Sequence, residues 1–312
     1  MNNPPPRPEQ LSDEQTMTRG PGSPWATRLV ILSVIFLVLA PIAIHQFPSE
    51  VARWYVAAGQ ESFLDGNQSA ALASIERAIA RDPKCVEAYL LLADVSAAAN
   101  DNEKALAAVE KLVEIQGDSP ALKLRRSHLL HALGSHHKAY EVLADIERWD
   151  VISDSIWLRL QTVNQRLWAS ILNARAYARA LSRENLADGL REVEQSLEIS
   201  RSLQTSSLDL WAELDTRGYL FYLLDRPADA RRDLDESVEL AEEIYRLVQK
   251  KSPALTTEPR TEKRNLESYR RSLAVVRYHR SLVYDQLGDK AAAQQDRQRV
   301  IELGFEPNAA LF

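Results

Sequence analysis

Residues 86–119 read VEAYLLLADVSAAANDNEKALAAVEKLVEIQGDS, and this stretch decides the fold. Apolar side chains recur three and four residues apart on both sides of a polar break at residues 100–102. That period is typical of amphipathic helices, and the Asn-Asp-Asn break is typical of a turn. Small residues at Ala93 and Ala105 would let the two helices approach closely. The stretch therefore predicts a helical hairpin.

The same pattern returns at a fixed interval along the chain. The turn recurs at Gly66, Asn100 and Gly134, each 34 residues after the last. Other copies of the unit follow further downstream, so that the repeating segments are 52–85, 86–119, 120–153, 211–244 and 274–307. An irregular helical bundle would not need turns at such regular positions. The repetition predicts a stack of helical hairpins.

The repeat resembles the tetratricopeptide repeat family, whose 34-residue unit is a helical hairpin with small and aromatic residues at set positions. Departures from the family pattern occur at Ser62 and Ser96, where tyrosine is common, and at Arg126, Arg217 and Arg280, where leucine is usual. The resemblance implies an all-α, right-handed solenoid of tetratricopeptide-type hairpins, here preceded by one transmembrane helix.

Composition agrees with a helical chain that binds neither nucleic acid nor structural metal. The 312 residues are 45% hydrophobic and 26% charged, with only ten glycines. Such a composition favours helix throughout. The net charge of −6 gives no general attraction to nucleic acid. Cys85 is the only cysteine, so no intramolecular disulfide or cysteine metal cluster can form.

The N-terminal region divides into a tail and an apolar segment. Residues 1–23 are rich in Pro, Asn and Ser and are expected to be disordered. Residues 25–47 are expected to form a transmembrane helix, because 29–44 carry no charge and the segment would span about 30 Å. A cleaved signal peptide is the alternative, but its best cleavage site is followed by Pro41. The anchor is therefore the favoured interpretation.

The orientation of this anchor follows from its flanking arginines. Arg19 and Arg28 precede the apolar segment, whereas Arg53 follows it together with Glu50 and Glu61. Positively charged flanks tend to stay in the cytoplasm. We expect a single-pass membrane protein with a cytoplasmic N-terminus and extracytoplasmic repeats.

The remaining chain is divided by the phase of the repeat. Residues 49–153 are expected to hold three repeats, and 208–312 two more with a loop at 252–261. The segment 154–207 is helical but out of phase with the repeats. A degenerate repeat that starts near Ser170, with Gly189 at the small position, is left open.

No catalytic motif is present. The sequence has no glycine-rich phosphate loop, nucleophile elbow or His-Glu-x-x-His pattern. His128, His131, His136 and His137 are close together and raise the possibility of a metal site, but surface histidines are the favoured interpretation. The basic run at 260–280 is favoured as a solvated helix face over a site for an acidic partner. We expect no enzyme activity, no cofactor and no metal.

The family resemblance implies that the first helix of each hairpin lines a concave, partner-binding face. The positions that it places there are Arg53, Gln60, Phe63, Glu87, Asp94, His128, His131, Asp215, Tyr219, Tyr222, Tyr278 and Asp285. Inward Val56, Gln60, Leu90 and Asp94 do not supply the basic clamp for a carboxylate terminus that some family members use. The expected function is a membrane-anchored adaptor for a protein or peptide, without an evident small-molecule substrate. The alternative is an architectural or self-associating solenoid.

Overall fold

The computed structural model describes residues 28–29, 32–33, 47–148, 158–203, 210–251 and 259–311. The chain separates into two units, Met1–Pro48 and Ser49–Phe312. The predicted transmembrane segment 25–47 lies almost entirely outside the described residues. No helix within those residues is both long and apolar enough to span a bilayer.

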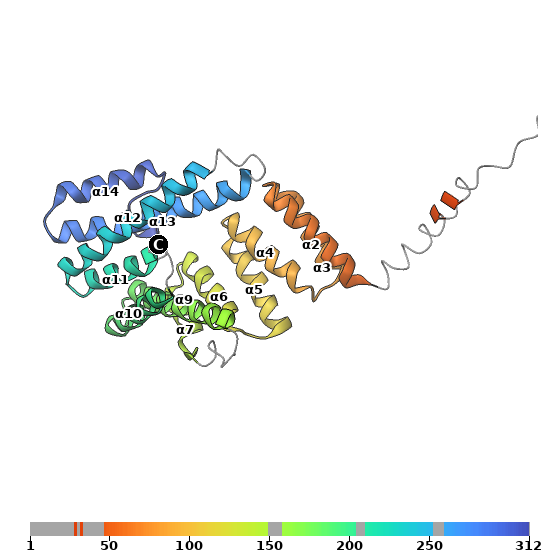
Figure 1. The fold of residues 1–312 in the computed structure, drawn as a ribbon, viewed down its shortest axis with the longest axis horizontal. Helices are drawn as coiled ribbons and strands as arrows, with labels where there is room; N and C mark the ends of the chain where they lie inside the picture. The colour runs from red at the N-terminus through yellow and green to blue at the C-terminus, as the bar shows by residue number, and fades with distance from the viewer. Residues whose placement is uncertain are drawn as a thin grey trace, which may run out of the picture. The chain divides into compact units, whose positions relative to one another are not determined.

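The second unit consists of antiparallel helical hairpins, and no strand occurs in the part of the chain that the structure describes (Figure 1). We call the first helix of each hairpin its A helix and the second its B helix. The hairpins are α2(Pro48–Leu64)–α3(Gln68–Arg81), α4(Val86–Ala98)–α5(Asn102–Gln116), α6(Pro120–Ala132)–α7(His136–Ala144), α9(Leu158–Ser182)–α10(Leu186–Ser202), α11(Trp211–Leu223)–α12(Pro227–Lys251) and α13(Pro259–Gln286)–α14(Lys290–Glu302). A short 3₁₀ helix, Ala309–Leu311, follows.

The predicted turns are confirmed by the backbone. Gly66, Asn100, Gly134, Asp225 and Gly288 all have φ between 58° and 82°. This left-handed conformation ends each A helix and reverses the chain. The backbone nitrogen that follows each of these residues then bonds a carbonyl five residues back, as in Asp101 N to Ser96 O at 2.9 Å. A recurring turn geometry therefore sets the hairpin length.

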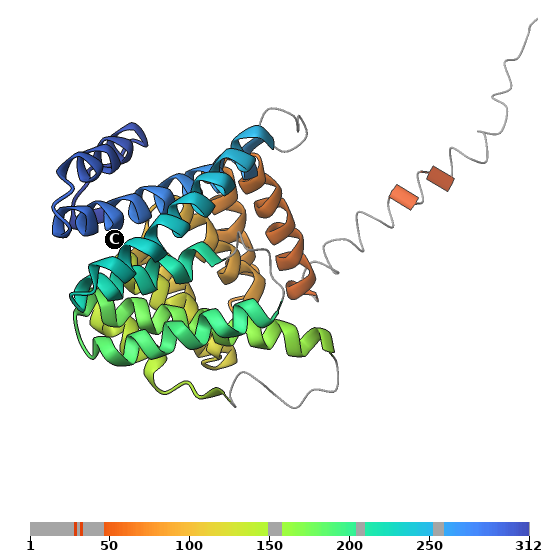
Figure 2. The same ribbon diagram turned by 60° about the vertical axis from the view of Figure 1, so that its left-hand side comes forward.

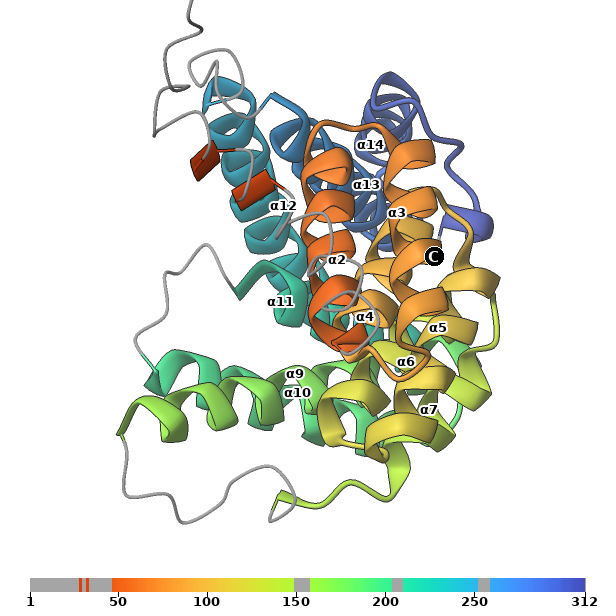
Figure 3. The ribbon, with the colours of Figure 1, turned by 90° about the vertical axis from the view of Figure 1, so that its right-hand side faces the viewer.

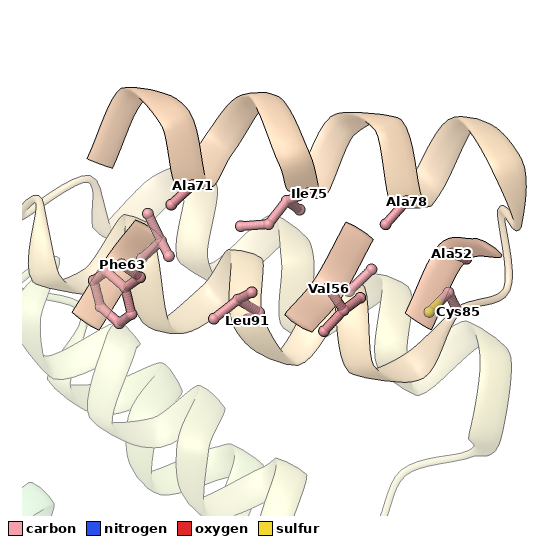
Figure 4. Close-up of a cluster of buried hydrophobic side chains, with 10 residues drawn as sticks. Ala52, Val56, Phe63, Ala71, Ile75, Ala78, Cys85 and Leu91 are labelled. Carbon is pink, nitrogen blue, oxygen red and sulfur yellow. The ribbon is translucent and has the colours of Figure 1, made fainter. Parts of the chain in front are cut away.

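Small residues at the hairpin interior allow the close helix contact that the sequence predicts. Ala93 and Ala105 are both essentially inaccessible to solvent. The same arrangement in the first hairpin places Ala71, Ile75 and Ala78 of α3 against α2 and α4 (Figure 4). Ile75 is fully buried at the centre of that cluster. Apolar packing between successive helices therefore supplies the main stabilisation.

Each hairpin packs on the next along the chain, through the pairs α3–α4, α5–α6, α7–α9, α10–α11 and α12–α13. Figures 2 and 3 show this order from two further directions. The α9–α10 hairpin, which falls in the segment predicted to be out of phase, continues the stack between α7 and α11. Gly189 of α10 lies at a small position against Ala176 and Arg179 of α9. In the last hairpin, α13 begins at Pro259, inside the segment for which the sequence predicts a loop.

The arginines that depart from the family pattern have carboxylate partners. Arg217 on α11 contacts Asp233 on α12 at 2.5 Å, and Arg280 on α13 contacts Asp296 on α14 at 2.7 Å. Arg126 on α6 contacts Glu110 on α5 at 3.0 Å and Asp118 at 2.8 Å. Both Asp233 and Asp296 are almost inaccessible to solvent. Ion pairs therefore replace apolar contacts between A and B helices at these positions.

Candidate functional site

A cavity of about 480 Å³ opens among four A helices, α6, α9, α11 and α13. Its volume lies in the range typical of ligand sites in proteins. The side chains around it belong to four successive hairpins and are mostly polar or aromatic. They are His128 and His131 of α6, Ser170, Asn173, Ala174 and Tyr177 of α9, Trp211, Ala212, Glu213, Asp215 and Thr216 of α11, and Ser272 and Val275 of α13.

His131 is the most enclosed of the imidazoles in this cavity, with 8% of its surface exposed. Its Nδ1 atom lies 3.2 Å from Nδ1 of His136, and its Nε2 atom has no hydrogen-bond partner. Burial, and then the neighbouring His136 and His128, lower the pKa of His131 to about 3. The ring is therefore neutral at physiological pH, so it offers the cavity a polar atom without a positive charge.

Beneath this cavity, His279 of α13 joins Asp215 of α11. The Nδ1 atom of His279 is 2.8 Å from a carboxylate oxygen of Asp215, and both residues are buried. Tyr219 stacks on His279, with ring centroids 4.1 Å apart and planes at 15°. Burial raises the pKa of Tyr219 to about 12, so the phenol stays neutral. These contacts fix the relative position of two A helices that form the cavity.

Tyr177 connects the two histidine groups. Its ring centroid lies 5.7 Å from that of His131 and 6.4 Å from that of His279. Burial raises the pKa of Tyr177 well above its ordinary value, so it remains a neutral phenol. The rings of His131 on α6 and Tyr177 on α9 thus form an aromatic wall of the cavity, while His279 on α13 is fully buried in the core next to Tyr177.

The polar part of the lining includes several acceptor atoms. Glu213 and Asp215 contribute carboxylates, and the Oδ1 atom of Asn173 is buried without a hydrogen-bond partner. Glu213 accepts a hydrogen bond from Ser200 at 3.0 Å. Among the described residues that line the cavity there is neither lysine nor arginine. The lining also includes the hydroxyl groups of Ser170, Thr216 and Ser272, so the site has both donors and acceptors for a ligand.

Three of the residues predicted for the binding face, His128, His131 and Asp215, line this cavity. The side chain of His128 is exposed where it lines the cavity. Tyr219 lies in the buried layer through its stack on His279, and Tyr222 is partly buried beside Tyr219, 6.0 Å away between ring centroids.

The remaining predicted residues are placed elsewhere on the A helices. Phe63 is buried in the core of the first hairpin, whereas Gln60 is exposed on α2. Arg53 is exposed and lies 3.0 Å from Glu50 and 4.0 Å from Glu87. The first two A helices thus contribute an exposed polar surface that does not join the cavity lining.

Two further hollows contain other predicted residues. Asp94, which pairs with Arg125, lines a groove together with Arg271 and Phe305, so this groove is bordered by both α4 and α13. Asp285 and Tyr222 line a third hollow, and hydrogen bonds from Arg297 and Lys290 lower the pKa of Asp285. Tyr278 is partly buried and packs against the core at the C-terminal end.

None of the predicted binding residues lies on α9, and Trp211, the first residue of α11, is not among them either. Ser170, Asn173, Ala174 and Tyr177 lie three and four residues apart and form one face of α9. That spacing is a signal in the sequence, but the segment 154–207 is out of phase with the repeats, and a degenerate repeat from about Ser170 is left open there. Glu213 and Ser272, which also line the cavity, are absent from the predicted binding residues as well.

His137, one of the four histidines that are clustered in the sequence, contacts two carboxylates. His137 lies 3.1 Å from Glu184 and 3.3 Å from Glu141. Across the residues that the structure describes, no three His, Cys, Asp or Glu side chains are grouped so as to hold a metal ion.

Comparison with known proteins agrees with the observed fold. Residues 63–129 match the tetratricopeptide repeat family. PilW, a widely conserved type IV pilus biogenesis factor, has a similar crystal structure with a TM-score of 0.53 at 14% identity. The similarity covers 84% of this chain and 96% of PilW. At this identity the likeness concerns the fold alone.

Two further solved structures have lower TM-scores. A tetratricopeptide repeat protein from Parabacteroides merdae gives a TM-score of 0.49 at 11% identity, over 82% of this chain and 94% of its own. YrrB, a tetratricopeptide repeat protein with an unusual peptide-binding site, gives a TM-score of 0.44 at 14% identity. The similarity covers 60% of this chain and 84% of YrrB. No curated protein matches the sequence. Residues 63–129 thus match the tetratricopeptide repeat model, and the chain has a tetratricopeptide-like helical solenoid fold.

Proposed function

We propose that the chain is a non-enzymatic adaptor that binds a segment of a protein partner on its A-helix face. The observation that carries this proposal is the cavity among α6, α9, α11 and α13. A stack held together only by core packing would have no need of a polar hollow at this position. This one has an unpartnered Nε2 on the buried His131 and an unpartnered Oδ1 on Asn173.

Burial of polar atoms without partners costs free energy in the unbound protein. A ligand that supplies the missing hydrogen bonds recovers that cost, and the aromatic wall adds apolar contact area. The mixture of aromatic and polar groups fits a peptide segment, since it offers both side-chain contacts and hydrogen bonds.

Filling the cavity tests this function. Ser170 is exposed at the cavity lining, so Ser170→Trp should occupy the space without disturbing the helix core. A protein that co-purifies with the unmodified chain from detergent-solubilised cells should be lost from Ser170→Trp. It should be retained by Glu103→Trp, a matched change at an exposed position of α5. Equal recovery by both variants would contradict binding at this face.

We also propose that residues 25–47 anchor the adaptor in a membrane, with the repeats on the extracytoplasmic side. The uncharged stretch 29–44 and the flanking arginines support this part of the proposal. Glu103→Cys places a thiol on an exposed surface of the repeats, whereas the native Cys85 is buried with a raised pKa. A membrane-impermeant thiol reagent should therefore label this variant in intact cells and leave the unmodified chain almost unlabelled. Labelling only after lysis would place the repeats in the cytoplasm.

The architectural alternative has one observation in its favour. Phe63 and Tyr219, which the family resemblance placed on the binding face, are packed in the core. If the solenoid served only to self-associate, its molar mass in light scattering would rise with concentration, and Ser170→Trp would leave co-purifying proteins unchanged.

A further inference from the structure

One face of α2 lacks the cover that the equivalent face of later A helices has. Trp54 on this face is 65% exposed. The residues 34 and 68 positions further along the chain, Ala88 of α4 and Leu122 of α6, are buried. Each of them lies in an apolar cluster with residues of the preceding B helix, α3 or α5. No hairpin precedes α2 among the described residues, so Trp54 occupies the place where a preceding B helix would pack.

The residues of α2 do not fit a further helix in that place. Glu61 is exposed, whereas the equivalent residues of α4 and α6, Val95 and Leu129, are buried and apolar. A helix that covered α2 along its whole length would bury the carboxylate of Glu61, which costs free energy. The face is therefore suited to a contact that covers only part of α2.

The start of α2 also argues against a helix that folds back onto it. The second A helix, α4, begins at Val86, and the same start one repeat earlier would be residue 52. However, α2 begins four residues sooner, at Pro48. The residues that connect a B helix to the next A helix in the later hairpin, 82–85, thus have helical equivalents here. No connecting loop is left for a reversal of the chain immediately before the repeat.

The apolar part of this face lies at the end of α2 that follows the segment 25–47 in the sequence. Val51 and Ala57 lie one turn on either side of Trp54 and are at least partly exposed. At 1.5 Å per residue, Trp54 is about 9 Å and Glu61 about 20 Å along the helix from its first residue. A lipid headgroup layer is roughly 5–8 Å thick. A helix inclined to a bilayer would therefore bring Trp54 to the headgroups and leave Glu61 in water.

The side chains near Trp54 are compatible with such a surface. Glu50 accepts a hydrogen bond from Arg53 at 3.0 Å, so these two exposed charges oppose each other. The Trp54 ring meets the ring of Tyr55 edge to face, with centroids 5.0 Å apart and planes at 69°. Indole combines a large apolar ring with one N–H donor, and tryptophan is enriched at the boundary between hydrocarbon and water.

We propose that the face of α2 formed by Val51, Trp54 and Ala57 contacts the lipid headgroups of the membrane, with the indole of Trp54 inserted among them. This inference rests on the proposed anchor at residues 25–47 and goes beyond it. The anchor alone ties the repeats to the membrane by one point of the chain. A second contact at Trp54 fixes the inclination of the first hairpin and hence the direction of the solenoid that follows.

Fluorescence quenching in vesicles tests this contact with the full chain. Trp54→Cys, combined with Cys85→Ala, carries a bimane fluorophore after reaction with a thiol reagent. The labelled chain is reconstituted in phosphatidylcholine vesicles that contain a lipid with a nitroxide on its headgroup. We expect the nitroxide to quench the fluorophore at position 54, because this position lies at headgroup level.

Two further positions on α2 are the matched controls. Arg53 precedes Trp54 directly but lies 4.0 Å from Glu87 of α4, so its side chain is directed toward the next hairpin. Glu61 lies about two turns beyond Trp54. Fluorophores at Arg53→Cys and Glu61→Cys should be quenched less than the fluorophore at position 54. Circular dichroism melting curves verify that each labelled chain is folded.

The native side chain is tested without a label. In vesicles of brominated phosphatidylcholine, the lipid should quench a smaller part of the total tryptophan fluorescence in Trp54→Ala than in the unmodified chain. If Trp54 is directed into water, the bromine atoms do not reach it, and the fluorescence that the lipid quenches would be the same in both chains. That result would overturn the inference.

A label inside the apolar segment separates this inference from the anchor on which it rests. The fluorophore at Ser33→Cys should be quenched by a nitroxide on the lipid acyl chain. Quenching at position 33 with equal quenching at positions 53 and 54 would overturn the contact at Trp54 and leave the anchor intact. Absence of quenching at position 33 would contradict the anchor itself. If nitroxide-labelled chains, and not nitroxide lipids, quench position 54, a second copy covers this face and the lipid contact is wrong.

Discussion

The Nδ1 atom of His279 lies 2.8 Å from a carboxylate oxygen of Asp215, although 64 residues separate them along the chain. The contact joins the A helices of the last two hairpins directly beneath the cavity. Both side chains are buried, so water cannot readily replace either partner. The bond therefore fixes the relative position of α11 and α13, two of the helices that line the cavity.

Removal of one partner of this bond should be costly. We expect Asp215→Ala to lower the free energy of unfolding by about 1.5–3 kcal/mol, the range for a hydrogen bond to a charged group. Urea denaturation followed by circular dichroism measures the effect. The double variant Asp215→Ala/His279→Leu should be less destabilised than the sum of the single changes. If the loss of unfolding free energy in the double variant equals the sum of the two single losses, the two groups do not interact.

The carboxylate of Asp296 should be essential to the last hairpin. It accepts hydrogen bonds from Arg277 and Arg280 at 2.7–2.8 Å and is almost inaccessible to solvent. Asp296→Ala leaves two partly buried guanidinium groups without this partner, and we expect a loss of about 3–5 kcal/mol. The matched control is Glu114→Gln, which breaks an exposed pair with Lys111. Its urea midpoint should stay close to that of the unmodified protein; similar losses in both variants would refute this distinction.

Gly218 is required by the close approach of α11 and α12. A Cβ atom added there would lie 2.6 Å from Cγ of the buried Leu234. We expect Gly218→Ala to destabilise the chain by about 1–3 kcal/mol through overpacking. Gly189→Ala is the control, since its nearest contacts would be 3.4 Å, and alanine should stabilise that helix by up to about 1 kcal/mol. Thermal unfolding should therefore shift in opposite directions, and equal shifts would contradict the packing argument.

Acid should destabilise the solenoid through His131. The pKa of this residue is about 3 in the folded chain and about 6.5 in the unfolded chain, so the unfolded state binds more protons between these values. The stabilising contribution is complete above about pH 6.5. It falls by at most about 1.4 kcal/mol per pH unit as the pH is lowered toward 3. The neighbouring His128 and His136, whose pKa values are also lowered, act in the same direction.

Replacement by a neutral side chain isolates this effect. His131→Gln should flatten the dependence of the urea midpoint on pH between about 6.5 and 4. His137→Gln, at an exposed imidazole that contacts Glu141 and Glu184, serves as the control. If the urea midpoint of His131→Gln depends on pH as it does in the unmodified chain, the buried imidazole does not contribute to the loss of stability in acid.

The repeats were predictable wherever a local signal marks the turn. Gly66, Asn100 and Gly134 carry such a signal, and each has the left-handed backbone that glycine or asparagine adopts most easily. The turn between α9 and α10 is different, because its residues with positive φ, Arg183 and Asn185, lie 49 and 51 residues after Gly134 and not 34. The sequence therefore predicts helices that are out of phase with the repeats in this segment, and the residues of α9 that line the cavity are not among the predicted binding residues.

The buried ion pairs illustrate another limit of the sequence. In the sequence alone, an arginine at a position that is usually leucine has no explanation, because its partner is not identified. Arg217–Asp233 and Arg280–Asp296 are each 16 residues apart, from an A helix to its own B helix. That shared spacing is visible in the sequence, but only the packing of the two helices shows that it brings the charges together.

The central claim, that the cavity contacts a partner protein, is tested most directly by photo-crosslinking in living cells. A photoreactive amino acid at position 170 lies at the cavity lining, whereas the same group at position 103 lies on an exposed surface of α5. We predict a discrete adduct from position 170 that is absent from position 103. No adduct at position 170, or the same adduct at both positions, would contradict the account.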